Sequence, residues 1–403
     1  MHYTAEFFCA NMTVEMDDTD KLKVLYEDAM KMGLTFEPPD VNRGMYRFEP
    51  VTDKVIRYGL GAIKGTGQQA IEAIIAAREG RGVGPRGETK GPFASLFDFC
   101  ARVDRTRLNK RTLEALIKGG AFDAMEMNRA SLAASIDRAF DFANALIANA
   151  NQGGLFDMMG DDSHGSSTQD PDLVEMVPWG VKERLTQEKT AIGFYLSGHL
   201  FDEVEKEVRR FVRTPIEELS DSREPQIMAG IVSDFRVING QRGRLALFKL
   251  DDKSATIEAS ADENVINAHR DLLKDDEFVV LLGRLQLDHF SGGLRVKVMQ
   301  GWDLASARAK FGRYLQVAVG DCAPDVQRLV REFPPKRQET PEGEVLVHGL
   351  RVRMGVRCQA EGQQAVAELQ LGEGSRFFPS DAALAAWSAE AGSGVVNVVY
   401  DAG

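Results

Sequence analysis

Apolar residues in the first half of the chain recur every three or four positions, which is the period of an α-helix. The clearest run follows a Gly-rich stretch: Ile71, Ile74 and Ile75. The same spacing predicts helices over 108–117 and 128–147, and an earlier helix that Asp18 or Thr19 can cap. The pattern therefore predicts a helical first half, with Gly-rich turns between the helices.

The pattern changes after residue 222. Five short apolar runs bounded by turn residues predict strands: 227–232, 245–250, 255–259, 278–283 and 294–298. A helix over 264–273 separates the third from the fourth, which is the order that a five-stranded oligonucleotide-binding barrel requires. Residues 306–403 alternate strand and helix signals and predict a small α/β domain. The fold class is therefore multidomain α+β.

Composition and charge exclude several classes of protein. No run approaches the length needed to span a membrane, and the N-terminus lacks a secretory signal pattern. The four cysteines are far apart, which favours reduced thiols in a cytoplasmic protein over disulfides or a zinc site. The few acidic clusters sit where a helix start or a turn explains them, so we expect no catalytic residues, metal or cofactor in this chain.

A basic block lies inside an acidic chain. Residues 54–129 hold 14 Lys/Arg against 8 Asp/Glu, whereas the whole chain has a net charge of −12. Within this block, Lys64-Gly65-Thr66-Gly67 directly precedes a predicted helix. Such a turn lets a backbone approach a phosphate closely and resembles the hairpin of a helix-hairpin-helix motif. The alternative is a plain Gly-rich turn.

A second hairpin is predicted at Gly119-Gly120, and basic residues precede or open the helix before it: Arg107, Lys110 and Arg111. Hairpins of this kind hold the DNA backbone without reading bases, so binding should be independent of sequence and sensitive to salt. The alternative is that these cations are solvated.

Gln152-Gly153-Gly154-Leu155-Phe156 is typical of a docking peptide. The carboxamide of Gln152 can form several hydrogen bonds, and Leu155 with Phe156 can fill one pocket on a partner. The alternative is an apolar pair at a helix end, with the two glycines as the stop signal. Residues 157–176 contain six acids and no Lys or Arg, which predicts a flexible loop.

Basic and aromatic residues gather on the predicted loops and strands of the barrel, where they suit single-stranded nucleic acid: Arg236, Arg242, Arg244, Lys249 and Phe290. The alternative is that the strand aromatics Phe235 and Phe248 face the core and the arginines are solvated.

The order of these parts resembles the C-terminal portion of the alpha subunit of bacterial DNA polymerase III, over essentially all 403 residues. The most specific stretches are Phe36-Glu37-Pro38-Pro39-Asp40-Val41-Asn42, 58–65, 116–123 and 193–199. One departure is Leu200, where the family usually has proline.

The resemblance implies six segments. They are a helical remnant of the fingers domain (1–50), a tandem helix-hairpin-helix domain (51–150), a clamp-binding peptide with an acidic loop (151–176), a helical connector (177–222), the barrel (223–305) and a domain that binds the tau subunit of the clamp loader (306–403). It implies that Gln152, Leu155 and Phe156 bind the sliding clamp.

The resemblance also assigns the two Gly hairpins to duplex DNA and the barrel to single-stranded template. The family's palm domain and its magnesium ions would lie upstream, so the chain alone is expected to be inactive. A stand-alone, non-catalytic DNA adaptor recruited by a clamp is the alternative.

Overall fold

The computed structural model describes residues 3–156, 170–222, 224–240, 243–287, 293–319, 323–339, 345–360 and 363–401. The chain forms two compact units, Met1–His199 and Leu200–Gly403, and each is described by itself.

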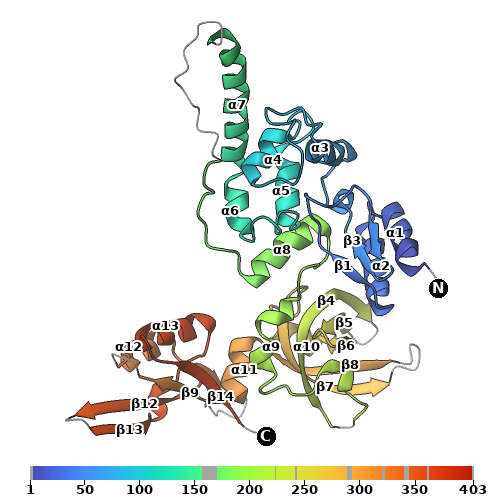
Figure 1. Ribbon diagram of the computed structural model, residues 1–403. Helices are drawn as coiled ribbons and strands as arrows, with labels where there is room; N and C mark the ends of the chain where they lie inside the picture. Colours follow the sequence, from blue (N-terminus) through green and yellow to red (C-terminus); the bar gives the residue numbers. More distant parts are fainter. Residues whose placement is uncertain are drawn as a thin grey trace. The chain divides into compact units, whose positions relative to one another are not determined.

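The first unit begins with two helices and a small sheet (Figure 1). The helices are α1 (Thr4–Val14) and α2 (Thr19–Lys31), and Asp18 caps α2 by accepting a hydrogen bond from the Lys21 N–H. The sheet has the order β1-β3-β2, with strands β1 (Thr35–Glu37), β2 (Glu49–Thr52) and β3 (Val55–Arg57). Sequence pattern predicted helices and an extended stretch at 38–42 over the first 50 residues, but not this sheet, because strands of three or four residues are too short to show an alternation.

Helices form the rest of this unit. They are η1 (Leu60–Ala62), α3 (Gln68–Arg78), α4 (Leu96–Arg102), α5 (Lys110–Lys118), α6 (Arg129–Ala134), α7 (Ile136–Phe156) and α8 (Val181–Ile192). The predicted helical region is confirmed, although one predicted helix is divided at Ser135 into α6 and α7. Gly153 and Gly154 do not end α7, whose backbone is helical through Phe156.

Two buried arginines hold these helices together. Arg102 is 1% exposed and donates to the carbonyl oxygens of Ala77, Thr89 and Gly91 at 2.7–3.0 Å. Arg129 is 4% exposed and pairs with Asp123 at 2.6 Å and with Glu188 at 3.1 Å. Because Glu188 belongs to α8, the second pair fixes α8 to the helices around the hairpins.

A closed five-stranded barrel forms the first part of the second unit (Figure 1). Its strands, in the order in which they pair, are β4 (Gln226–Gly240), β5 (Gly243–Asp251), β6 (Thr256–Asp262), β8 (Leu294–Trp302) and β7 (Phe278–Leu287). Helix α10 (Glu263–Ala268) follows β6. The parallel pair β6–β8 completes the barrel. The predicted oligonucleotide-binding barrel is confirmed, with a shorter helix than the sequence pattern indicated.

A connector precedes the barrel and contains η2 (Leu200–Glu203), α9 (Glu205–Val208) and η3 (Ile216–Glu218). Asp252, at the turn after β5, is 1% exposed and anchors this connector. Its Oδ2 accepts hydrogen bonds from Arg209 at 2.8 Å and from the Ile216 N–H at 2.9 Å. The connector is thereby packed against the barrel.

Helix α11 (Leu304–Phe311) leads into a four-stranded sheet of order β13-β12-β9-β14. Its strands are β9 (Gly312–Ala318), β12 (Arg351–Ala360), β13 (Gln363–Gln370) and β14 (Val396–Tyr400). The remaining elements are α12 (Val326–Glu332), β10 (Lys336–Glu339), β11 (Val345–His348), η4 (Glu373–Ser375) and α13 (Asp381–Ala391). Sequence pattern missed β13, whose composition does not favour a strand; pairing with β12 imposes it.

Arg308 joins this domain to the connector. Its guanidinium donates two 2.8 Å hydrogen bonds to Glu207, and Glu207 also accepts one from the Tyr400 hydroxyl at 2.5 Å. Burial alone would raise the pKa of Glu207, but these hydrogen bonds and the charge of Arg308 lower it. The carboxylate is therefore held in its charged form between α9, α11 and β14.

Candidate nucleic-acid interface

The first predicted hairpin is a tight turn that ends at the start of α3. Gly65 has φ +85°, a left-handed conformation that glycine adopts without a steric penalty. Thr66 is buried, and its Oγ1 donates to the carbonyl oxygens of Leu60 at 2.8 Å and Ile63 at 2.6 Å. The Thr66 side chain therefore holds the turn from inside, and Lys64 and the two glycines are exposed to solvent.

Gly67 is the N-cap residue of α3, and no side chain caps that helix. Gln68 and Gln69, in the first turn, are exposed. An uncapped helix N-terminus presents N–H groups and the positive end of the helix dipole, and both favour an anion such as a phosphate. The hairpin thus has the backbone geometry that its sequence predicted.

Helix α5 begins beside this turn. Asn109 caps α5 by accepting from the Thr112 N–H at 2.8 Å, and Thr112 Oγ1 donates to the Gly65 carbonyl at 3.2 Å. Arg111 is exposed, and its Nε lies 3.9 Å from where a Cβ on Gly65 would stand. Lys64, which directly precedes Gly65 in the chain, is also exposed. The fold therefore places two cations from distant parts of the sequence around one glycine turn.

Lys110 and Arg107 lie near the same helix start and have acidic neighbours. Lys110 pairs with Asp137 at 2.7 Å, and Arg107 lies 3.7 Å from Asp104. Both cations are more than half exposed, so these pairs are worth little and can be exchanged for another anion.

The glycines of the second predicted hairpin are packed inside the unit. Gly119 and Gly120 are buried. A Cβ on Gly119 would meet Ile63 at 3.2 Å, and one on Gly120 would stand 2.3 Å from Nη2 of Arg129. Both glycines let side chains pack closely inside the unit. Their predicted contact with DNA stays a prediction.

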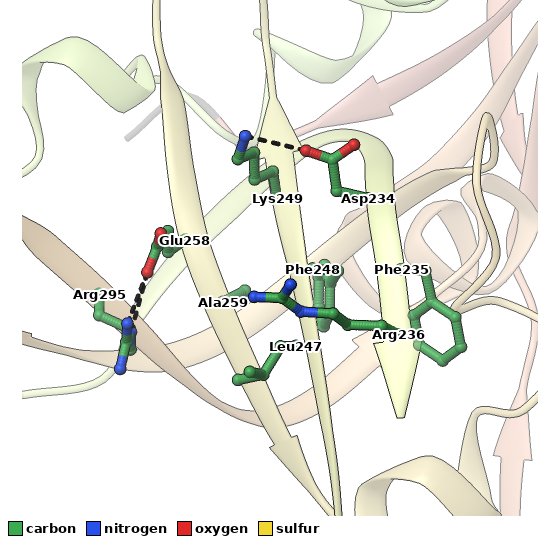
Figure 2. A pocket seen from close by; sticks show the side chains of 9 residues that line it. All are labelled: Asp234, Phe235, Arg236, Leu247, Phe248, Lys249, Glu258, Ala259 and Arg295. Carbon is green, nitrogen blue, oxygen red and sulfur yellow. Dashed lines mark hydrogen bonds and ion pairs between the residues drawn. The ribbon is translucent and has the colours of Figure 1, made fainter. Parts of the chain in front are cut away.

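The barrel has a surface pocket of about 550 Å³ on strands β4, β5, β6 and β8. Figure 2 shows nine side chains that line it, among them three cations and two carboxylates. Lys249 pairs with Asp234 at 2.8 Å, and Arg295 pairs with Glu258 at 2.6 Å. The predicted residues Arg236 and Lys249 meet in this pocket.

Arg236 differs from the other two cations. It is exposed and has no carboxylate partner among the residues that the structure describes. Its side chain extends from β4 across β5 toward β6 (Figure 2). A β-bulge between Ser233 and Arg236, with Asp234 at φ +55°, shifts the alternation so that Arg236 faces outward. Of the three cations in this pocket, Arg236 is therefore the one without an acidic partner among the described residues. An incoming phosphate would pair with it directly.

The two strand aromatics pack toward the barrel core, which is the alternative that the sequence left open. Phe248 is 3% exposed and belongs to the barrel core, and Phe235 is partly buried against that core. Phe248 therefore offers no ring to a base, and Phe235 offers only the part of its ring that the core leaves uncovered.

The other barrel residues predicted to contact single-stranded DNA are placed less favourably for that contact. Arg244 bonds Glu263 and Asn267, each at 3.0 Å, and its hydrogen bonds lower the pKa of Glu263. Arg242 and Phe290 lie outside the described residues. Sequence reasoning missed Arg295, although the alternation in Leu294-Arg295-Val296-Lys297-Val298 already indicates which side chains of this strand face outward.

The docking peptide lies at the end of α7, which projects beyond the other helices of its unit (Figure 1). The backbone of Gln152, Leu155 and Phe156 is helical, and their side chains lie outside the described residues. Residues 157–169, most of the predicted acidic loop, also lie outside them.

Within the described part of the chain, no group of three or more His, Cys, Asp or Glu side chains is arranged to hold a metal ion. None of the helices described there has both the length and the apolar character needed to cross a membrane.

Known proteins resemble this chain along almost its whole length. A family model described as a helix-hairpin-helix motif matches residues 33–132, which include the Gly65 turn. The DNA polymerase III subunit alpha of Neisseria meningitidis serogroup B is 43% identical over 334 residues, or 82% of this chain and 28% of that protein. That of Escherichia coli is 34% identical over 407 residues, or 99% of this chain and 33% of that protein. The chain belongs to the DNA polymerase III alpha subunit family.

The matches fit a C-terminal portion of these alpha subunits. The chain spans about a third or less of the length of these curated relatives. The family resemblance drawn from the sequence stretches is thus confirmed.

Solved structures match only part of the chain. The SSB domain of a Synechococcus protein is 16% identical, with a TM-score of 0.18, and covers 21% of this chain. The second OB-fold domain of replication protein A from Methanococcus maripaludis has the same identity and TM-score and covers 23%. The assignment of the barrel rests on its strand order rather than on these scores.

Proposed function

We propose that this chain is the DNA-guiding and processivity portion of a replicative DNA polymerase alpha subunit. Family membership and the helix-hairpin-helix motif support a DNA-binding role. The observation that carries the finer proposal is the Gly65 turn, which follows the exposed Lys64, lies beside Arg111 and leads into the uncapped start of α3.

The Gly65 turn binds a phosphate of duplex DNA. The N–H groups at the start of α3 donate to the phosphate oxygens, and Lys64 with Arg111 neutralises its charge. Lys110 and Arg107 exchange their exposed acidic partners for neighbouring phosphates. None of these groups reads a base edge, so the grip is independent of sequence and lets the duplex slide.

The barrel binds single-stranded template near Arg236. Because Lys249 and Arg295 already have acidic partners and the strand aromatics pack toward the core, this contact is weak and is dominated by one phosphate. It directs the template strand and contributes little to the total affinity.

Two protein partners complete the proposal. Gln152, Leu155 and Phe156 bind the sliding clamp, and residues 306–403 contact the tau subunit of the clamp loader. Burial of Leu155 and Phe156 contributes about 1.5–3 kcal/mol for each side chain, so the isolated peptide binds weakly. The hairpins raise its effective concentration, because clamp and hairpins hold the same DNA. The six sequence segments keep their proposed roles within this scheme.

The duplex contact is tested by measuring affinity for a primed duplex against salt concentration. Lys64→Gln with Arg111→Gln should lower the salt slope by about two, since each phosphate contact contributes roughly one. Lys23→Gln with Lys31→Gln, two exposed cations of α2, is the matched control and should leave the slope unchanged. An equal slope in the hairpin variant would exclude this turn as a DNA contact.

The clamp contact is tested with Leu155→Ala and Phe156→Ala together. Titration with the sliding clamp should show binding lost, whereas Ile147→Ala, which removes a 39%-exposed side chain from the same helix, should bind as before. Unchanged affinity in the double variant would remove the clamp from the proposal and leave the DNA contacts standing. A separate titration with tau tests the last segment: no binding at roughly 10 μM, an affinity of about −7 kcal/mol, would remove that partner alone.

A further inference from the structure

Strand β14 is the last strand of its sheet, so one of its edges has no strand beside it among the described residues. The Ala318 N–H donates to the Val395 carbonyl at 2.8 Å, which makes 395 and 318 a hydrogen-bonded pair of the antiparallel ladder. Because such pairs alternate, 397 and 399 also face β9, whereas the N–H and C=O of Val396 and Val398 point to the open edge.

This edge forms one wall of a groove of about 450 Å³. The groove is lined by the five consecutive residues Asn397, Val398, Val399, Tyr400 and Asp401. Side chains of a strand alternate between the two faces of a sheet, so a run of consecutive lining residues means that the groove follows the backbone edge itself. Arg210 and Arg213, which follow α9, form the opposite wall.

The groove is positively charged. Arg210 and Arg213 are exposed, and Asp401 is the carboxylate among the residues that line the groove. Asp401 already lies 3.6 Å from Arg313, and its carbonyl oxygen accepts a hydrogen bond from Arg213 at 3.1 Å. The lining of the groove therefore holds two arginines and one carboxylate.

We propose that the open edge of β14 binds an extended, acidic segment of a partner protein as an added strand. The segment pairs with the N–H and C=O groups of Val396 and Val398, and its acidic side chains face Arg210 and Arg213. The site is separate from the DNA contacts at Gly65 and Arg236, and it does not depend on which protein supplies the segment.

Nucleic acid fits the groove less well than a peptide. The rings nearest the groove are already stacked: Phe211 on Tyr400 at 4.9 Å, and Phe211 on Phe311 at 5.5 Å. These stacked faces are therefore not available to a base. A strand edge offers donors and acceptors at the spacing of a peptide backbone, whereas a phosphate chain has no donors to match the open carbonyls.

The proposal is tested with a fluorescein-labelled, terminally blocked peptide of sequence Glu-Val-Glu-Val-Glu-Val-Glu, titrated with the full chain by fluorescence anisotropy. Arg210→Glu with Arg213→Glu should weaken binding about tenfold or more, because two attractive charges become repulsive. Arg337→Glu, at an exposed arginine of β10, is the control and should bind like the unaltered chain. Equal affinity of the double variant would overturn the proposal.

A second peptide separates strand addition from charge attraction alone. N-methylation of alternate residues keeps every charge but removes the N–H groups that pair with β14, so binding should be lost. The normal peptide should also slow hydrogen exchange at the Val398 amide. Binding of the methylated peptide with unchanged affinity would overturn the strand-addition model.

Two further measurements separate a loss of peptide binding from unfolding of the variant and from binding of single-stranded DNA. If the unfolding temperature of the double variant falls, Arg210→Gln alone replaces it, because Arg213 also bonds the Asp401 backbone. Oligo-dT is titrated in parallel: competition with the peptide, together with loss of dT binding in the arginine variant, would assign the groove to single-stranded DNA instead.

Discussion

The hydroxyl of Thr112 donates a hydrogen bond to the carbonyl oxygen of Gly65 across 3.2 Å, linking two turns that are 47 residues apart in the sequence. This contact places the start of α5 against the first hairpin and brings Arg111 to the same turn as Lys64. Neither residue alone makes a phosphate site. The cluster exists because the hydrogen bond from Thr112 to Gly65 holds the start of α5 beside the turn that leads into α3.

Gly65 and Gly67 should respond differently to alanine. Gly65→Ala forces a side chain into a left-handed conformation at φ +85° and should cost about 1–2 kcal/mol of stability. Gly67→Ala meets no atom within 4 Å at an ordinary φ of −76° and should leave the fold intact. Urea denaturation followed by circular dichroism measures both. Equal losses for the two variants would mean that the turn conformation is not what the φ angles indicate.

Arg236 should matter more than Lys249 for single-stranded DNA. Arg236→Ala removes an unpaired cation from the barrel pocket, whereas Lys249→Ala also frees Asp234 from its 2.8 Å ion pair. Anisotropy with labelled oligo-dT should show the affinity falling further for Arg236→Ala, by about 1 kcal/mol at low salt. A larger loss with Lys249→Ala would move the contact toward the β4–β5 side of the pocket.

Glu188 should be essential for the stability of the first unit. It is 1% exposed and accepts hydrogen bonds from Arg129 at 3.1 Å and from the Ser197 N–H at 2.7 Å. Glu188→Gln leaves the positive charge of the buried Arg129 guanidinium only partly neutralised. The variant should lose about 3 kcal/mol of unfolding free energy. Glu183→Gln, exposed on the same helix, is the control and should change little in denaturant unfolding. A loss below roughly 1 kcal/mol would show that Asp123 compensates Arg129 by itself.

Stability of the second unit should fall in mild acid because of His269. Burial lowers the pKa of His269, and its Nε2 accepts a hydrogen bond from the Gly301 N–H at 3.3 Å. With the folded pKa below the unfolded value of about 6.5, the unfolded chain takes up a proton first as the pH drops. His269 thus contributes to the stability of the folded state above about pH 6.5, and this contribution is lost as the pH falls toward the folded pKa.

Denaturant unfolding at pH 7.5 and pH 5.5 measures this loss. His269→Gln keeps an acceptor near Gly301 but cannot titrate, so its stability should change less between the two pH values. An equal change in both proteins would assign the acid sensitivity to other groups.

Local sequence patterns predicted many of the elements correctly, and the failures have physical causes. The Gly65 hairpin, the Asp18 cap and the barrel strands depend on residues close together in the chain, and each was found. The burial of Gly119-Gly120 was not, because a Gly pair marks a sharp turn equally well when it is exposed or packed under Arg129. Arg244 likewise looked available until α10 placed Glu263 beside it.

The sequence by itself determined where helices and strands form, that basic residues concentrate over 54–129 and that the family is that of DNA polymerase III alpha subunits. These features rest on periodicity, composition and short motifs, all of which are local in the chain. Only the tertiary structure decided which cations share a site. Packing brings Arg111 to the turn that follows Lys64, leaves Arg236 without an acidic partner among the described residues and sets Arg210 opposite β14. Burial or ion pairing then decides which charges remain available.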